Sequence, residues 1–274
     1  MRFNKLKEIC RCCPVWLALL PIVLLSTPVS GKDGIHLKGR YYRLVTPAGN
    51  AEEEVILNPQ RTAFMLIDVY GLFSDDKAYQ DLPEFYKSPP EKEKARREIY
   101  QRILSAKKAA KALNLPVVYL QNYLAPSTNE NTEWRVMSMR TCGVDVLKAW
   151  QEPNIILAFS GMMAPEPGEY VIKKQMYSGF FETDLHSLLQ SLDVKNLVVV
   201  GFDANVCLRT TVTDAMYRGY RIVLLRDCTT TGEFPDTQEG GYANKLAVRF
   251  IEANVGYTAT ADEFVKACQS AGKR

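Results

Sequence analysis

The sequence contains very little histidine and lacks the common nucleotide-binding and serine-hydrolase motifs. Its 274 residues include only two histidines, His36 and His186, which leaves few ligands for a zinc site. There is no GxSxG elbow, no GxGxxG fingerprint and no phosphate-binding glycine loop, and no CxxC pair occurs after residue 31. These absences argue against a structural zinc site, an α/β-hydrolase serine nucleophile and a dinucleotide-binding site.

Clustered charge of one sign is also missing. The chain has 34 lysine and arginine residues against 31 aspartate and glutamate residues, a formal net charge of +3. Residues 1–31 contain four of the basic residues and one of the acidic residues, so the remainder of the chain is balanced. A nucleic-acid-binding surface needs an unbalanced, clustered set of lysine and arginine. We therefore expect no nucleic-acid partner.

Apolar runs long enough to span a membrane are absent, and the longest apolar run lies near the start of the chain. "VWLALLPIVLL" at residues 15–25 follows a basic segment and precedes the small residues of "STPVSG". This is the layout of a secretory signal peptide cleaved near residue 31. A membrane anchor is the alternative, but spanning a bilayer takes about 20 apolar residues, and Pro21 interrupts this run. We predict a signal peptide over residues 1–31 and a secreted or periplasmic mature protein, without stable membrane insertion.

The rest of the chain alternates short apolar runs with amphipathic segments. Residues 32–54 are polar and irregular and are interpreted as an N-terminal arm. Strands are predicted at residues 62–68, 117–121, 170–174, 196–201 and 221–225, and helices at 91–114, 183–192, 207–219, 237–254 and 260–269. This alternation favours one α/β domain over residues 55–270, with a mostly parallel sheet covered by helices on both faces.

Four cysteines follow residue 31, namely Cys142, Cys207, Cys228 and Cys268. Four scattered cysteines in a domain of this size do not make a disulfide framework. In an exported protein a pair of them can oxidise, and we expect any such disulfide to join two of Cys142, Cys228 and Cys268. Cys207 is expected to stay out of any disulfide, because its position after a strand makes it a candidate nucleophile and a nucleophile needs a free thiol.

Three reactive side chains follow three of the predicted strands. Asp68 ends "TAFMLID", Lys174 ends "YVIKK", and Cys207 follows "NLVVVG" at the start of a helix. Taken singly, each has an ordinary explanation: a helix cap, a surface charge or a buried core cysteine. In an open parallel sheet, however, ligands bind beyond the carboxyl ends of the strands. An acid, a base and a nucleophile at that edge together predict a catalytic site.

The surroundings of Cys207 suggest how its sulfur would be activated. A helix N-terminus and a nearby ammonium both favour thiolate, so we expect its pKa to lie below the ordinary thiol value. Asp68 can carry the thiol proton to a leaving group. In the turn "GFDAN", the backbone amides of Asp203 and Cys207 can form an oxyanion hole. Asn205 is expected to cap the helix.

These segments are similar to the motifs of the isochorismatase-like cysteine hydrolases, whose triad is aspartate, lysine and cysteine. The resemblance runs from residue 62 to residue 268 and is carried by "FMLIDVY", "IKKQMYSGFFETDL" and "VVVGFDANVCLRTTVTDAMYRGYRIVLLRDCT". The register of the second motif selects Lys174 over Lys173. The resemblance implies a doubly wound, mostly parallel six-stranded sheet, a homo-oligomer, and a cis peptide bond between Phe202 and Asp203.

Within this family, "YSGFFETDL", "ANVC" and "YLQNY" are most similar to the ureidoacrylate amidohydrolases. This likeness nominates Asn122, Tyr177 and Tyr70 for substrate binding, with Tyr70 standing where the family often has glutamine or asparagine. The metal-binding aspartate and histidine residues of nicotinamidases have no counterpart in "LQNYLAPSTNENTEW". We therefore expect no metal and no other cofactor.

The leading hypothesis is an exported, metal-independent hydrolase of an amide, ureido or carbamoyl C–N bond in a small molecule. Cys207 would attack the carbonyl, Asp68 would shuttle the proton, Lys174 would hold charge, and an acyl-thioenzyme would form. Three alternatives stay open: hydrolysis of another small-molecule bond, ligand binding without catalysis in the same cleft, and thiol redox chemistry with a resolving cysteine.

Overall fold

The computed structural model describes residues 34–81, 87–124, 132–143, 145, 157–159 and 161–273. The predicted signal peptide at residues 1–31 lies outside this part of the chain. Within it, no helix combines the length and the apolar character that a membrane-spanning helix needs.

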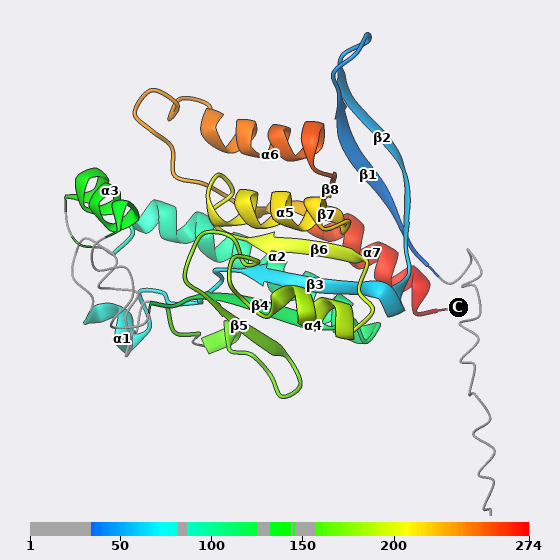
Figure 1. The fold of residues 1–274 in the computed structure, drawn as a ribbon, viewed down its shortest axis with the longest axis horizontal. Coiled ribbons are helices and arrows are strands. Elements are labelled where there is room, and N and C mark those ends of the chain that lie inside the picture. Colours follow the sequence, from blue (N-terminus) through cyan, green and yellow to red (C-terminus); the bar gives the residue numbers. More distant parts are fainter. Residues whose placement is uncertain are drawn as a thin grey trace, which may run out of the picture.

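The described residues form an eight-stranded sheet with the strand order β2-β1-β8-β7-β6-β3-β4-β5 (Figure 1). Six of these strands run parallel to one another: β3 (Thr62–Ile67), β4 (Val117–Asn122), β5 (Tyr170–Lys174), β6 (Asn196–Gly201), β7 (Arg221–Thr229) and β8 (Tyr257–Ala259). Five of them, all but β8, are strands that the sequence predicted. β8 was not predicted, because its three residues are too few to show a pattern.

The other two strands come from the segment interpreted as an irregular arm. β1 (Ile35–Arg43) and β2 (Gly49–Leu57) form an antiparallel hairpin, and β1 pairs antiparallel with β8. The hairpin projects past one edge of the sheet (Figure 1). Its base is buried in the core through Ile35, Leu37, Val55 and Leu57. The sheet thus has eight strands rather than six, and the alternation of apolar and polar residues in "IHLKGR" was the signal for β1.

Helices cover both faces of the sheet (Figure 1). Residues of α2 (Pro90–Ala112) and α7 (Ala261–Ala271) form one core, and those of α4 (Leu185–Ser191), α5 (Cys207–Tyr217) and α6 (Tyr242–Asn254) form the other. Successive residues of β3 supply the two cores in turn, Phe64 to the first and Met65 to the second. Burial on both faces explains the continuous apolar sequence of this central strand.

Two further helices, α1 (Lys77–Gln80) and α3 (Glu133–Cys142), lie beyond the carboxyl ends of the parallel strands (Figure 1). Short 3-10 turns occur at Pro59–Arg61 and Gly161–Met163. The chain passes from β3 to β4 and β5 on one side, then returns to β6 on the other. This switch falls between β3 and β6, and in doubly wound sheets ligands bind beyond the carboxyl ends of the strands at such a point.

Gly201 brings these two strand ends into direct contact. The N–H of Phe202 donates to the carbonyl of Ile67 at 2.8 Å. A Cβ added to Gly201 would lie 2.0 Å from that carbonyl oxygen, and the residue has a φ of +119°. Only glycine fits this close approach and this backbone conformation. The turn that carries Cys207 therefore starts against the strand that carries Asp68.

Candidate active site

The three catalytic candidates meet beyond these strand ends. Asp68 directly follows β3, Lys174 is the last residue of β5, and Cys207 is the first residue of α5. The Nζ of Lys174 donates to Oδ2 of Asp68 at 3.1 Å. Since β4 lies between β3 and β5, the lysine side chain crosses the end of β4 to reach the carboxylate. Lys174 is fully buried and Asp68 nearly so.

The thiol of Cys207 lies beside both charged groups. Burial raises its pKa well above the ordinary thiol value, and Asp68 adds to the rise through its charge and by accepting a hydrogen bond. Lys174 opposes this rise without cancelling it. The expectation of a lowered pKa was therefore wrong, because at 6% exposure the cost of burying a thiolate outweighs the ammonium and the helix N-terminus. The resting sulfur is a protonated thiol that Asp68 is placed to deprotonate.

Asn122 and Tyr70, both nominated for substrate binding, are partners of the triad. Asn122 accepts a hydrogen bond from Nζ of Lys174 through Oδ1, and its backbone N–H donates to the Tyr70 hydroxyl at 2.8 Å. That hydroxyl donates in turn to Oδ1 of Asp68 at 3.0 Å. Burial and the charge of Asp68 raise the pKa of Tyr70, so it stays a donor. The Tyr70 hydroxyl thus holds Oδ1 of Asp68, and Lys174 holds Oδ2.

Tyr177, the third residue nominated for substrate binding, packs against α3. Its ring meets Trp134 edge-on with 5.7 Å between the ring centroids. Its carbonyl accepts a bond from the Thr211 hydroxyl at 3.4 Å. None of its contacts within the described residues involves the triad. Trp134 was not singled out from the sequence, although tryptophans in the polar stretch after β4 were a usable signal.

The turn between β6 and α5 leaves two backbone N–H groups unused. The peptide bond between Phe202 and Asp203 is cis, as the resemblance implied. The N–H of Ala204 donates to the carbonyl of Thr230 at 3.0 Å, and those of residues 206 and 208 donate to the carbonyl of Asp203. In the part of the chain that the structure describes, no hydrogen bond occupies the N–H of Asp203 or of Cys207. These are the two amides nominated for the oxyanion hole.

Asn205 does not cap α5. The N-cap position falls on Val206, which makes no side-chain cap bond. Oδ1 of Asn205 instead accepts a bond from Nη1 of Arg209 at 3.3 Å. The expected cap was wrong because the helix starts one residue later than the asparagine would require.

The remaining cysteines and histidines take no part in the site. The four described cysteines are free thiols: Cys142 is exposed, and Cys207, Cys228 and Cys268 are buried. The two histidines contact Glu54 in the hairpin and the Tyr220 hydroxyl beside α4. Over the described ranges, no group of three or more histidine, cysteine, aspartate or glutamate side chains could hold a metal ion.

Known proteins share both the sequence and the architecture of this chain. Residues 62–246 match the isochorismatase domain. The chain is 28% identical over 245 residues to the ureidoacrylate amidohydrolase RutB of Methylorubrum extorquens, and the match covers 85% of this chain and 92% of that protein. The match with RutB is longer than the isochorismatase domain, because its 245 aligned residues exceed the span of residues 62–246.

Two solved structures have the same fold. A cysteine hydrolase from Pseudomonas syringae pv. phaseolicola has a TM-score of 0.63 at 24% identity, with 78% of this chain and 95% of that chain covered. The N-carbamoylsarcosine amidase of Thermoplasma acidophilum has a TM-score of 0.52 at 20% identity, with 74% and 97% covered. At these identities the likeness establishes the architecture, and the domain match covers more than half of the sequence. The chain belongs to the isochorismatase family.

Proposed function

We propose that this protein is an exported cysteine hydrolase that cleaves an amide, ureido or carbamoyl C–N bond of a small molecule. The observation that carries the proposal is the buried ion pair of Asp68 and Lys174 beside the Cys207 thiol. A thiol, a carboxylate that accepts its hydrogen bond and a fixed ammonium are the parts that acyl transfer to sulfur requires. The amidohydrolase and the amidase among the similar proteins support the C–N bond class.

The first half of the proposed reaction acylates the enzyme. As the sulfur of Cys207 attacks the carbonyl carbon, the thiol proton passes to the carboxylate of Asp68. The carbonyl oxygen takes the negative charge and is bound by the N–H groups of Asp203 and Cys207. Collapse of this intermediate breaks the C–N bond, and Asp68 gives its proton to the leaving nitrogen. The acyl group remains on sulfur as a thioester or thiocarbamate.

The second half consumes water. A water molecule gives one proton to Asp68 while its oxygen attacks the acyl carbon, and the same two amides bind the oxyanion. Collapse breaks the C–S bond, and the proton on Asp68 returns to the sulfur. Lys174 stays charged throughout, stabilising the carboxylate when it is ionised and the sulfur when it develops charge. In this sequence of steps the sulfur is the nucleophile and no metal-bound water is needed.

Export and self-association complete the proposal. The basic start, the apolar run at residues 15–25 and the small residues after it support cleavage near residue 31 and a secreted or periplasmic location. Exposed apolar side chains on and before α6, namely Phe234, Tyr242 and Leu246, support a homo-oligomer.

A substrate panel with matched cysteine variants tests the function. The purified protein is offered ureido acids, carbamoyl amino acids and simple amides, and release of ammonia or acid is measured. We expect turnover of at least one class, and Cys207→Ala should abolish it with the fold intact. Cys268→Ala removes another buried cysteine, one that lies in α7, and should keep the activity.

The same panel separates the alternatives. If no compound is hydrolysed but one raises the melting temperature, the protein is a ligand-binding member of the family. Hydrolysis that survives Cys207→Ala would reject the thiol mechanism outright. Peptide mapping without reduction that finds Cys207 in a disulfide during turnover would favour redox chemistry.

A further inference from the structure

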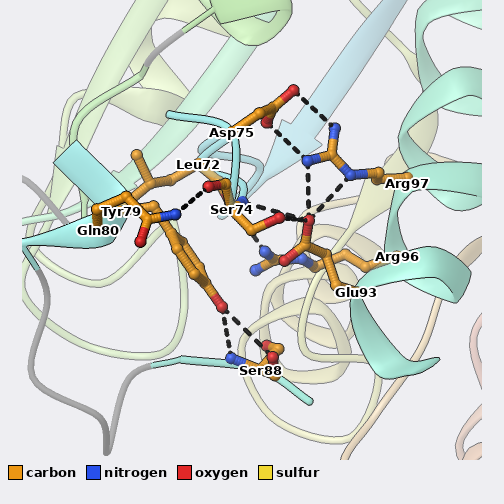
Figure 2. Close-up of polar contacts among 9 residues, drawn as sticks. All are labelled: Leu72, Ser74, Asp75, Tyr79, Gln80, Ser88, Glu93, Arg96 and Arg97. Atoms are coloured by element: carbon orange, nitrogen blue, oxygen red, sulfur yellow. Dashed lines mark hydrogen bonds and ion pairs between the residues drawn. The ribbon is translucent and has the colours of Figure 1, made fainter. Parts of the chain in front are cut away.

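The first half of α2 faces the loop that follows Asp68. This aspartate loop, residues 69–76, leaves the end of β3 and carries Tyr70, the hydrogen-bond partner of Asp68. Four side chains of α2 contact it: Glu93, Arg96, Arg97 and Tyr100. Their spacing of three, four and seven residues places them on one face of the helix. Figure 2 shows the first three of them against the loop.

Glu93 and Arg97 hold the outer part of the loop. The Oε1 of Glu93 accepts bonds from the backbone N–H of Ser74 at 3.2 Å and from its hydroxyl at 2.6 Å (Figure 2). Arg97 Nη2 donates to the same oxygen at 2.8 Å and to Oδ1 of Asp75 at 2.6 Å. Burial opposes ionisation of Glu93, yet the bonds from Ser74 and Arg97 hold its pKa below the ordinary value. The carboxylate is therefore a charged anchor for the loop.

Arg96 holds the middle of the loop. Its Nη2 donates to the carbonyl of Leu72 at 2.8 Å. The guanidinium groups of Arg96 and Arg97 lie 4.7 Å and 4.3 Å from the ring centroid of Phe73, within the range of cation–π attraction. Since Phe73 is buried, the loop is fixed through its backbone and through an aromatic side chain.

Tyr100 contacts both the aspartate loop and the nucleophile turn, which is residues 202–206 between β6 and α5. Its hydroxyl accepts a bond from the N–H of Gly71 at 3.3 Å, and its ring meets Phe73 edge-on at 4.9 Å. The same ring stacks on Phe202, with 5.6 Å between centroids and 17° between planes. Phe202 directly precedes Asp203, whose N–H is nominated for the oxyanion hole. One side chain of α2 thus spans the segments that carry the proton acceptor and the nucleophile.

We propose that Tyr100 is a positioning residue that fixes the aspartate loop against the nucleophile turn, with Glu93, Arg96 and Arg97 anchoring the same loop to α2. It touches none of the reacting groups and acts through Gly71 and Phe202. The proposal rests on the proposed function, because proton transfer from Cys207 to Asp68 is the step that needs this alignment. A displacement of about 1 Å at such a site can cost a factor of about 100 in rate.

Tyr100→Phe is the deciding variant, and Tyr220→Phe is its matched control. Each tyrosine is 4% exposed and stacks on a phenylalanine. The hydroxyl of Tyr220 accepts a bond from Gln190 at 3.1 Å. Each variant is assayed for kcat and KM on a substrate from the panel. The pH dependence of iodoacetamide modification at Cys207 is read by peptide mass spectrometry, which separates this thiol from the exposed Cys142.

We expect Tyr100→Phe to lower kcat about tenfold with KM changed less than about twofold. We also expect the midpoint of Cys207 alkylation to fall by about half a pH unit, because Asp68 raises the thiol pKa less when the loop shifts. Tyr220→Phe should lower the melting temperature similarly and move neither quantity. Tyr100→Leu should enlarge both effects.

Two results would overturn the positioning role. One is a kcat and an alkylation midpoint in Tyr100→Phe that match those of Tyr220→Phe. The other is a fall in kcat with an unchanged midpoint, since the thiol would then still sense Asp68 as before. The alkylation profile is measured without turnover. A failure of the proposed function would appear instead as full activity in Cys207→Ala, so the two failures are distinguishable.

Discussion

Lys174 and Asp68 form a buried ion pair, with 3.1 Å between Nζ and Oδ2 and side chains that are 0% and 8% exposed. Burying two charges is costly, and a protein with hydrophobic residues in their place is often as stable or more stable. Removing only one partner is worse, because it strands the other charge. At the carboxyl edge of the sheet the pair lies beside the Cys207 thiol, where Asp68 adds to the rise in pKa caused by burial and Lys174 opposes it.

The two charge variants should move the thiol pKa in opposite directions. Lys174→Met removes the group that lowers the pKa of Cys207, so the pKa should rise further and alkylation at neutral pH should slow. Asp68→Asn removes a group that raises it, so the pKa should fall, yet turnover should be lost with the proton carrier. The measurement is the pH profile of Cys207 alkylation together with kcat.

Lys173→Met is the control for Lys174→Met. The two lysines are adjacent in β5, but Lys173 points out of the core and its ammonium lies 4.8 Å from the Tyr123 ring centroid. Lys174→Met should lower the free energy of unfolding by about 3 kcal/mol or more, as expected when one member of a buried pair is lost. Lys173→Met should change stability and thiol pKa little. Equal effects of both would remove Lys174 from the site.

The protein should lose stability at alkaline pH through its buried thiols. Burial raises the pKa of Cys268 to about 12, and it also raises the pKa values of Cys207 and Cys228. A thiol with a higher pKa in the folded state binds its proton more tightly when folded. Its contribution to stability is complete below the unfolded value, about 8.5, and is lost as the pH rises toward the folded value.

Chemical unfolding between pH 7 and pH 11 checks this dependence. Cys268→Ala should make the decline in unfolding free energy shallower, because one proton fewer is linked to folding. Cys142→Ala should leave the decline unchanged, since that thiol is exposed in the folded protein. A decline that is the same in both variants would assign the alkaline loss to other groups.

Gly201→Ala should cost both stability and activity. The new Cβ would collide with the carbonyl of Ile67, and the φ of +119° disfavours alanine as well. We expect a loss of about 3 kcal/mol and a large fall in kcat, because the strand ends carrying Asp68 and Cys207 must separate. Gly219→Ala is the control, with a φ of +82° but nothing within 4 Å of the added Cβ. It should cost about 1 kcal/mol and leave kcat unchanged.

The mature protein should begin near Gly31 or Lys32. Intact-mass measurement of protein recovered from the periplasm or the medium gives the cleavage position directly. A mass that retains residues 15–25, with the protein in the membrane fraction, would establish the anchor instead of the signal peptide.

Much of the fold could be predicted because local pattern and burial coincide in its central elements. The apolar run of β3 reflects burial on both faces, and the periodic apolar residues of α2, such as Ile99 and Ile103, reflect packing on one face. The order of strands and helices then implied which ends share an edge. Asp68, Lys174 and Cys207 could be grouped from the sequence for this reason, and the structure brings them together.

What the sequence left undecided depends on distances between segments that are far apart in the chain. The direction of the Cys207 pKa is set by how completely the thiol is buried and how close Asp68 lies, and neither can be read from residue order. Tyr70 and Asn122 were nominated from the sequence as substrate contacts, and their hydrogen bonds to the triad form only when β3, β4 and β5 pair in register. Sequence alone determined which reactive groups share one edge of the sheet. Tertiary packing decided which of them touch, and therefore which group holds the proton.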